Sequence, residues 1–180
     1  MVSSARMAKI KAISYRCAIY AIALYILAIA QVSFFGKINL FGATPDLLLA
    51  AIAVLCMKEE HNICTICGII SGFFYFALGG GQSPLYIIFS FFCAYLFYFV
   101  AEHSPSRKFV SYLTLCALIF AAKAIFNIIE TSLFSSSFVV IRIFGTVVIP
   151  EYVSSMAFCS VSYLLFSIIA GLIHKKSTKG

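Results

Sequence analysis

The stretch from Thr44 to Val100 constrains the fold of this chain more than any other. It consists of three apolar segments separated by two short turns, KEEHN and GGGQS. The whole chain is 63% hydrophobic and 11% charged, with a mean hydropathy of +1.06, whereas a typical soluble domain is about 25% charged. This composition excludes an ordinary soluble domain and predicts an all-α protein whose helices lie in a lipid bilayer.

Six apolar segments are candidates for membrane helices. They are Cys17–Phe35, Pro45–Met57, Ile63–Leu78, Pro84–Val100, Phe109–Ile129 and Tyr152–Ile173. A full span takes roughly 20 residues, so the second and third are short, although extending the second back to Asn39 makes it long enough, with Pro45 as a break inside it. We predict a six-transmembrane-helix bundle built by a single domain over residues 1–180. A five-span arrangement, with the second and third segments as a re-entrant pair, stays open.

The placement of lysine and arginine predicts which helix ends are cytoplasmic. If the N-terminus is cytoplasmic, ten of the 13 basic residues fall on the inner side, Lys37 and Arg142 fall on the outer side, and Lys123 lies within a span. We therefore predict that both termini are cytoplasmic, including a basic tail over residues 1–16 and a short tail over residues 174–180. The net charge of +7 follows from this topology and does not indicate a nucleic-acid partner.

Residues 1–16 allow two interpretations, a short helix on the inner leaflet with its basic side chains near anionic headgroups, or a frayed basic tail. The following apolar run ends in Ala28-Ile29-Ala30 before Gln31, which is similar to a signal-peptide cleavage site. The run is longer than a usual signal-peptide core, so we expect it to remain as the first helix.

Five polar residues within or beside the apolar segments are candidate site residues. Lys123, Asn127 and Glu130 follow one another at spacings of four and three, which puts them on one helix face. Charged side chains are costly on the lipid side, so we expect this face to point into the bundle near its outer half. Asp46 and Glu151 fall at the outer boundary. We expect Lys123 to pair with Glu130, Asp46 or Glu151. The favoured interpretation is a structural buried pair, and the less favoured one is a transport site.

Two segments have the chemistry of a helix start. In Thr44-Pro45-Asp46 we expect the Thr44 hydroxyl to cap the helix, with Pro45 at the first helical position and the Asp46 carboxylate at the positive end of the helix dipole. Pro150 and Glu151 repeat the order of proline and acid at the start of the last segment. We expect that replacing either acid with alanine weakens assembly with a partner.

Small residues predict where helices pack closely. Gly68 and Gly72 form a pair spaced by four residues, which allows the backbone of another helix to approach. Pro84 follows a glycine-rich turn and is expected to open the fourth helix. These residues are therefore interpreted as packing residues.

The cysteines raise the question of a metal or redox site. His61, Cys64 and Cys67 are spaced by three and share a helix face. A zinc site needs a fourth ligand, and no second motif supplies one, while the predicted topology puts these thiols near the reducing inner face. We predict no metal, no cofactor and no catalytic residue, and interpret the cysteines as small hydrophobes. A membrane redox enzyme that uses Cys64 and Cys67 is a less favoured alternative.

The order of these motifs resembles the MreD family of rod shape-determining membrane proteins, in its short firmicute form. The matching features are the basic start, GATPDLLLA at residues 42–50, an acidic turn with Glu60, GIISGFF, PLYIIFSFFCAYL after a glycine turn, and IPEYV at residues 149–153 leading to Tyr163. The family often has an aspartate shortly after the second glycine of the third helix, where this chain has Phe76.

This resemblance implies a non-enzymatic scaffold of the bacterial cytoplasmic membrane, with a fold similar to that of the vitamin-binding S components of ECF transporters. The partners that it implies are MreC, MreB, RodA and a class B penicillin-binding protein, which together direct peptidoglycan synthesis for rod cell shape, and membrane lipids. The alternative is an S component itself. That class often carries an AxxxA motif in its first helix, whereas the pair noted here, Ala117 and Ala121, lies in the fifth segment.

Overall fold

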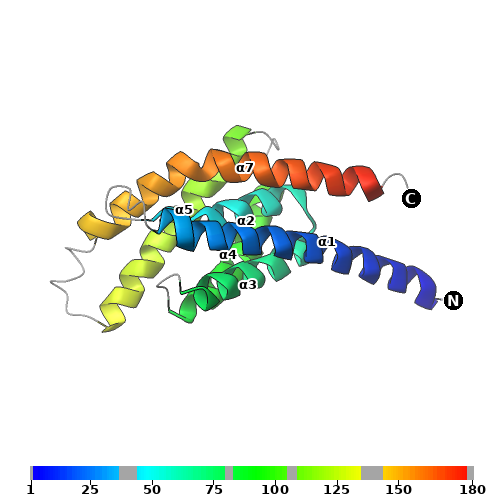
Figure 1. Cartoon of the computed structure of the whole chain (residues 1–180), viewed down its shortest axis with the longest axis horizontal. Helices are drawn as coiled ribbons and strands as arrows, with labels where there is room; N and C mark the ends of the chain where they lie inside the picture. The colour runs from blue at the N-terminus through cyan, green and yellow to red at the C-terminus, as the bar shows by residue number, and fades with distance from the viewer. Residues whose placement is uncertain (1, 37–43, 80–82, 105–108, 135–143, 178–180) are drawn as a thin grey trace.

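The computed structural model describes residues 2–36, 44–79, 83–104, 109–134 and 144–177, and these ranges contain helices but no strand. The helices are α1 (Val2–Ala30), α2 (Leu47–Lys58), α3 (His61–Ala77), α4 (Leu85–Glu102), α5 (Phe109–Phe134) and α7 (Ile149–Ser177). A short π-helical turn, η1 (Gln31–Phe35), continues α1, and a second, η2 (Phe144–Val148), leads into α7. The all-α prediction is confirmed. Helix α1 begins and α7 ends at the same end of an elongated bundle (Figure 1).

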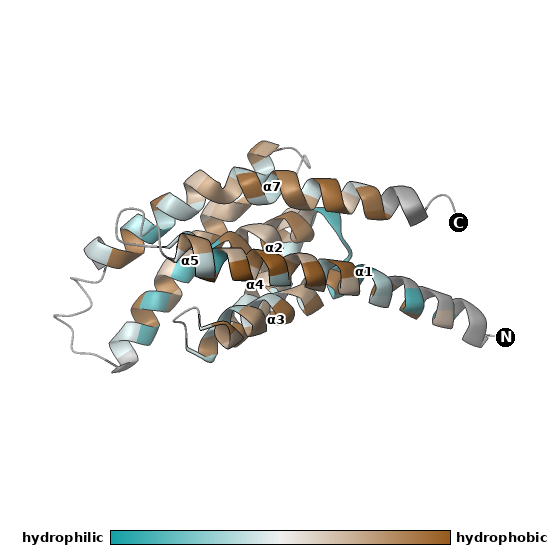
Figure 2. Cartoon of the chain, in the orientation of Figure 1, coloured by the Kyte–Doolittle hydropathy of each residue, from teal (hydrophilic) through white to brown (hydrophobic). Residues whose placement is uncertain are grey.

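Among the helices of the described ranges, four are long and apolar enough to cross a membrane. The candidate spans are Ile13–Phe35, Leu85–Glu102, Phe109–Ser132 and Gly145–Ile173. Hydrophobic residues extend along most of the length of these helices (Figure 2). The chain is therefore a multi-pass helical membrane protein, with α2 and α3 as two shorter apolar helices.

Helix α2 lies at the centre of the bundle. All of its residues from Leu47 to Met57 are buried, and α1, α3, α4, α5 and α7 all pack against it. Its 12 residues correspond to roughly 18 Å of helix, well short of the ~30 Å hydrocarbon core. A helix enclosed by protein has no lipid contact and need not match the thickness of the bilayer, so its short length is compatible with this position.

The start of α2 differs from the sequence prediction. The helix begins at Leu47, and residues 44–46 are not helical. The predictions that Pro45 breaks a longer helix from inside and that it occupies the first helical position are therefore wrong. Residues 39–43 lie outside the described part of the chain. Because α2 is buried, it needs no extension toward Asn39 to reach a full span.

Residues 2–16 are helical and continue into the first span without a break. This differs from both interpretations of the segment, the separate helix and the frayed tail. The physical reason is that the sequence contains no glycine or proline before Gly36, and these residues are the ones that most readily end a helix.

Glycines bring α3 and α4 into close contact, as their spacing predicts. A Cβ atom added at Gly68 would lie 2.5 Å from the Cβ atom of Ala94, and one added at Gly72 would lie 2.9 Å from the Cα atom of Ile87. The Ser90 hydroxyl of α4 donates a hydrogen bond to the Gly68 carbonyl at 2.7 Å. The two backbones are therefore so close that α3 has no room for a side chain at either position.

Two prolines stand at helix starts, as predicted. Pro84 immediately precedes α4, with a φ of −55°, and Pro150 is the second residue of α7. Proline suits the first turn of a helix because its missing amide hydrogen would have no partner there.

Replacing Gly68 with alanine is expected to destabilise the protein by about 1–3 kcal/mol, the usual effect of forcing a methyl group into a packed interface. Gly171 in α7 is the matched control, because nothing lies within 4 Å of a Cβ atom added there, and Gly171→Ala should be neutral or stabilise by up to about 1 kcal/mol. Thermal unfolding in detergent micelles, followed by circular dichroism, measures both. Equal midpoints for the two variants would contradict the proposed α3–α4 contact.

Candidate functional site

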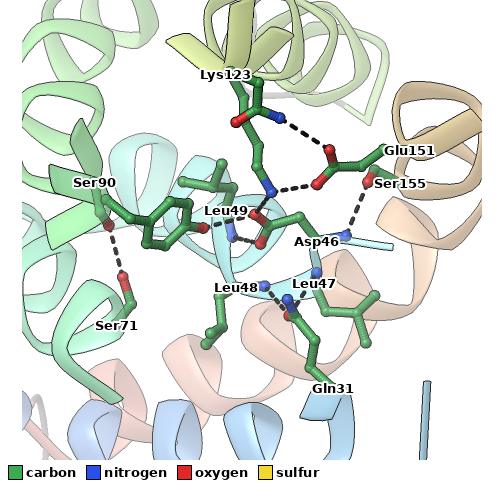
Figure 3. Close-up of polar contacts among 12 residues, drawn as sticks. Gln31, Asp46, Leu47, Leu48, Leu49, Ser71, Ser90, Lys123, Glu151 and Ser155 are labelled. Atoms are coloured by element: carbon green, nitrogen blue, oxygen red, sulfur yellow. Dashed lines mark hydrogen bonds and ion pairs between the residues drawn. The ribbon is translucent and has the colours of Figure 1, made fainter. Parts of the chain in front are cut away.

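The N-terminus of α2 lies inside the bundle, where its free amides need protein partners. The first amides of a helix have no partner within the helix, and a buried donor left unpaired costs about 1–3 kcal/mol. The amides of Leu47 and Leu48 donate to Gln31 Oε1 at 2.9 and 3.1 Å. The amide of Leu49 donates to Asp46 Oδ1 at 3.0 Å. Side chains therefore satisfy the whole first turn of α2 (Figure 3).

Asp46 caps α2, so the prediction that Thr44 is the cap is wrong. The Asp46 carboxylate accepts the amide of Leu49, and the Asp46 amide donates to Ser155 Oγ of α7 at 2.8 Å. A carboxylate has two oxygens, so one remains free for a second set of contacts while the other caps the helix. A threonine hydroxyl at this position would lack that second oxygen.

Asp46, Lys123 and Glu151 form a buried ionic cluster (Figure 3). Together with Tyr86 and Asn127, this cluster is called the Lys123 network. The Lys123 ammonium donates to Asp46 Oδ2 and, at 2.5 Å, to Glu151 Oε1. The Tyr86 hydroxyl donates to Asp46 Oδ2 at 2.6 Å, and Asn127 Nδ2 donates to Glu151 Oε2 at 3.1 Å. The network thus joins the start of α2 to α4, α5 and α7.

The charges of the network are shielded from the surroundings to different degrees. The side chains of Lys123 and Asp46 are 3% and 1% exposed, whereas that of Glu151 is 12% exposed. Charges at such depth in a membrane protein persist only when they pair with one another. Lys123 is therefore held as the shared cation of two carboxylates that lie far apart in the sequence.

The structure brings four of the five candidate site residues together and leaves Glu130 apart. Glu130 lies seven positions after Lys123 in the sequence, which is roughly 10 Å along a helix. Among the described residues it makes no ion pair. Lys123 therefore has two of its three expected partners, because the starts of α2 and α7 lie level with Lys123 and not with Glu130.

Three residues of the site were not singled out from the sequence as site residues, and they are Gln31, Tyr86 and Ser155. Each is of a type that is common in membrane helices, and a hydrogen-bonding glutamine near the end of a span is ordinary. The available signal was weak, because it consisted only of the polar side chain of Gln31 near the end of an apolar segment. Only the position of α2 reveals that its amides need these partners.

A second charged cluster holds the other end of α2. Glu59 follows α2 directly, and its side chain is 0% exposed. The Tyr20 hydroxyl donates to Glu59 Oε1 at 2.6 Å, and Arg16 donates to Glu59 Oε2 at 3.3 Å. Both donors belong to α1, so a carboxylate at each end of the central helix attaches it to its neighbours.

The cysteine and histidine pattern of α3 is used in packing. Cys64 and Cys67 are fully buried, and the Cys64 sulfur lies 2.9 Å from that of Cys56 in α2. The His61 ring packs against aromatic rings of α4, with its centroid 4.9 Å from that of Tyr95. Among the described residues no three histidine, cysteine or acidic side chains are grouped so that they can hold a metal ion.

The Lys123 network leaves little free volume. A cavity of about 10 Å³, lined by residues that include Lys123, Glu151 and Ser155, lies beside it. This is about the space that one water molecule needs. This cavity is therefore too small for an organic ligand.

No family model matches the chain, and no curated protein or solved structure matches it.

Replacing Lys123 with methionine is expected to destabilise the bundle by about 3–5 kcal/mol, the usual cost of removing one partner from a buried ion pair. Adding Asp46→Asn should recover part of this loss, because it removes one of the two unpaired charges. Glu130→Gln, on the same helix but outside the network, should change stability by no more than about 0.5 kcal/mol. Thermal unfolding in micelles separates these cases, and similar midpoints for Lys123→Met and Glu130→Gln would contradict the network.

Glu59 and its neighbour Glu60 offer a second matched pair. Glu59→Ala leaves the buried Tyr20 hydroxyl without its acceptor, so we expect a loss of about 1–3 kcal/mol. Glu60 is exposed and its side chain does not cap α3, so Glu60→Ala should stay within about 0.5 kcal/mol of the wild type. Protease sensitivity of α1 in micelles gives an independent readout. It should rise for Glu59→Ala, and the attachment of α2 to α1 is refuted if it rises equally for both variants.

Proposed function

We propose that this chain is a non-enzymatic scaffold of the cell-wall elongation machinery in a bacterial cytoplasmic membrane. In this proposal it binds MreC and works with MreB, RodA and a class B penicillin-binding protein to direct peptidoglycan synthesis for rod cell shape. The support from the sequence is the ordered set of motifs that resembles the MreD family, above all GATPDLLLA, GIISGFF and IPEYV.

One structural observation carries the proposal, which is that these motifs meet. GATPDLLLA supplies Asp46 and IPEYV supplies Glu151, and both side chains bind Lys123. GIISGFF supplies the two glycines on which α4 packs, and the PLYIIFSFFCAYL segment supplies most of α4. The motifs that carry the resemblance thus have architectural tasks, which supports a scaffold more than an enzyme.

The burial of Asp46 changes how its role in assembly is explained. At 1% exposure its carboxylate does not reach a partner protein. Its replacement with alanine is therefore expected to weaken assembly indirectly, by releasing the start of α2 from α5 and α7. Binding of MreC would use the outer surfaces of the helices that the network holds in place.

The alternative is a substrate-binding S component of an ECF-type vitamin transporter, which the helix number and chain length favour. Binding sites for small organic molecules usually enclose about 300–1,000 Å³ and contain a few convergent polar groups. The cavity at the Lys123 network is about 10 Å³, and cavities of about 250 and 230 Å³ are lined mainly by apolar side chains. Within the described residues, the geometry therefore favours the scaffold.

A pull-down of the tagged chain from its own membranes in a gentle detergent, with mass spectrometry of the co-purified proteins, tests the proposal. We expect MreC and the wall-synthesis enzymes to be recovered. Recovery of an ECF energising module in place of MreC would contradict the scaffold and support the alternative.

The same pull-down tests the indirect role of the Lys123 network. Asp46→Ala should lower the recovery of MreC in proportion to the loss of thermal stability, because both follow from the release of α2. Glu130→Ala serves as the control and should keep both at the wild-type level. A variant of Asp46 that keeps full stability but loses MreC would show that this explanation is wrong.

A further inference from the structure

The hairpin of α3 and α4 is short compared with the helices on the other side of the bundle. Helix α3 has 17 residues and α4 has 18, which correspond to roughly 26 and 27 Å of helix. The candidate spans of α5 and of η2 with α7 have 24 and 29 residues, or roughly 36 and 44 Å. Helices α3 and α7 lie on opposite sides of the bundle (Figure 1). The apolar height of the bundle therefore differs between these two sides.

Both ends of α3 are fixed, so the helix cannot lengthen to fit a thicker bilayer. Only Glu59 and Glu60 separate α2 from α3. The His61 ring at the start of α3 packs against the ring of Phe99 in the last turn of α4, with ring centroids 5.2 Å apart. At the other end Gly79 has a φ of +75°, a left-handed conformation that commonly ends a helix. The α3–α4 hairpin therefore has a set height.

One face of α3 is exposed from near its start to its end. Large apolar side chains follow one another on this face at spacings of three, four and three and are 40–54% exposed, and they are Ile66, Ile69, Phe73 and Phe76. Such spacings place them on one side of a helix. These four residues are called the outer α3 stripe. Burial frees α2 from matching the bilayer, but α3 has to match it, because this stripe faces outward.

A bilayer of ordinary thickness does not fit a helix of this length. Its hydrocarbon core is ~30 Å thick, about 4 Å more than the length of α3. A long span fits by tilting, whereas a short one needs a thinner bilayer, flanking side chains that reach the interface, or cover from another helix. Long basic side chains are the ones that reach the interface best. The exposed residues at the ends of α3 include Glu60, Asn62 and Gly79, which are not of this type.

The outer α3 stripe is better suited to lipid than to another helix. Close helix contacts in membranes use small residues, and the glycines of α3, Gly68 and Gly72, already pack against α4. The stripe itself consists of branched and aromatic side chains. Of the three ways to match a short helix, a thinner bilayer is therefore the one that these residues favour.

We propose that the bilayer is locally thinned along the outer α3 stripe, which therefore collects phospholipids with short acyl chains. Short chains cover the stripe without extending beyond the ends of α3. The side of α7 has no such preference, because a long span adapts by tilting. The proposal needs only a bundle that spans a membrane, so its failure would leave the scaffold proposal untouched.

Tryptophan quenching by brominated lipids tests the two sides of the bundle separately. The chain contains no tryptophan, so Phe73→Trp on the stripe and Leu164→Trp on α7 each introduce a single fluorophore. The native side chains are 54% and 62% exposed at these positions. Each variant is reconstituted in mixtures of phosphatidylcholines with 14-carbon and 18-carbon chains, and one of the two lipids is brominated in each experiment. The quenching gives the relative affinity of the two chain lengths at that position.

We expect Phe73→Trp to report a preference of about twofold for the 14-carbon lipid, and Leu164→Trp to report none. The same relative affinity at both positions would overturn the proposal. Weak quenching of Phe73→Trp by both lipids would also overturn it, because it would show that protein covers the stripe.

Lengthening the apolar face of α3 gives a second test. Replacing Glu60 and Asn62 with leucine extends this face by roughly 4 Å. In the Phe73→Trp background, the preference for the short chain should then fall toward equal affinity, while the same change should not alter the Leu164→Trp reading. If the double replacement does not fold, Asn62→Leu alone takes its place, with a smaller fall expected. An undiminished preference in a folded variant would refute the thinning.

Discussion

The position of α2 at the centre of the bundle depends on finding partners for the polar groups at its ends. A helix has free amides at its start, and in a membrane protein no water is at hand to satisfy them. Gln31, Asp46 and Ser155 supply acceptors for these amides, and they come from η1, the approach to α2, and α7. Without them this buried apolar helix would carry an unpaired end into the interior.

In the Lys123 network, the residue that caps the buried amides of α2 also pairs with a buried charge. Asp46 caps α2 with one oxygen and binds Lys123 and Tyr86 with the other. A buried ion pair is weak evidence for high stability, because removing charges from water is costly. Its effect here is on specificity, since Lys123 meets both Asp46 and Glu151 only when α2, α5 and α7 stand at one relative height.

The two ends of α2 are attached to different helices of the bundle. At one end Asp46 connects to α4, α5 and α7, and at the other Glu59 connects to α1 through Arg16 and Tyr20. Between them most contacts are apolar, although the Tyr112 hydroxyl donates to the Ala50 carbonyl, and the small residues of α3 bring α4 close. Such a core offers little for chemistry, whereas the outer apolar faces of the helices stay available to lipid.

The sequence by itself determined the helical class, the number of main helices, and that the four residues Asp46, Lys123, Asn127 and Glu151 avoid lipid. Contact with lipid favours helical backbone and apolar side chains at each position, whatever the rest of the fold is. These features can therefore be read from composition and spacing alone. The tertiary structure alone decided that α2 is central, that Asp46 caps it, that Lys123 binds Asp46 and Glu151, and that Glu59 binds α1. An apolar helix inside protein has the same composition as one that faces lipid, and the partner of a charge depends on the rotation and height of helices far apart in the chain.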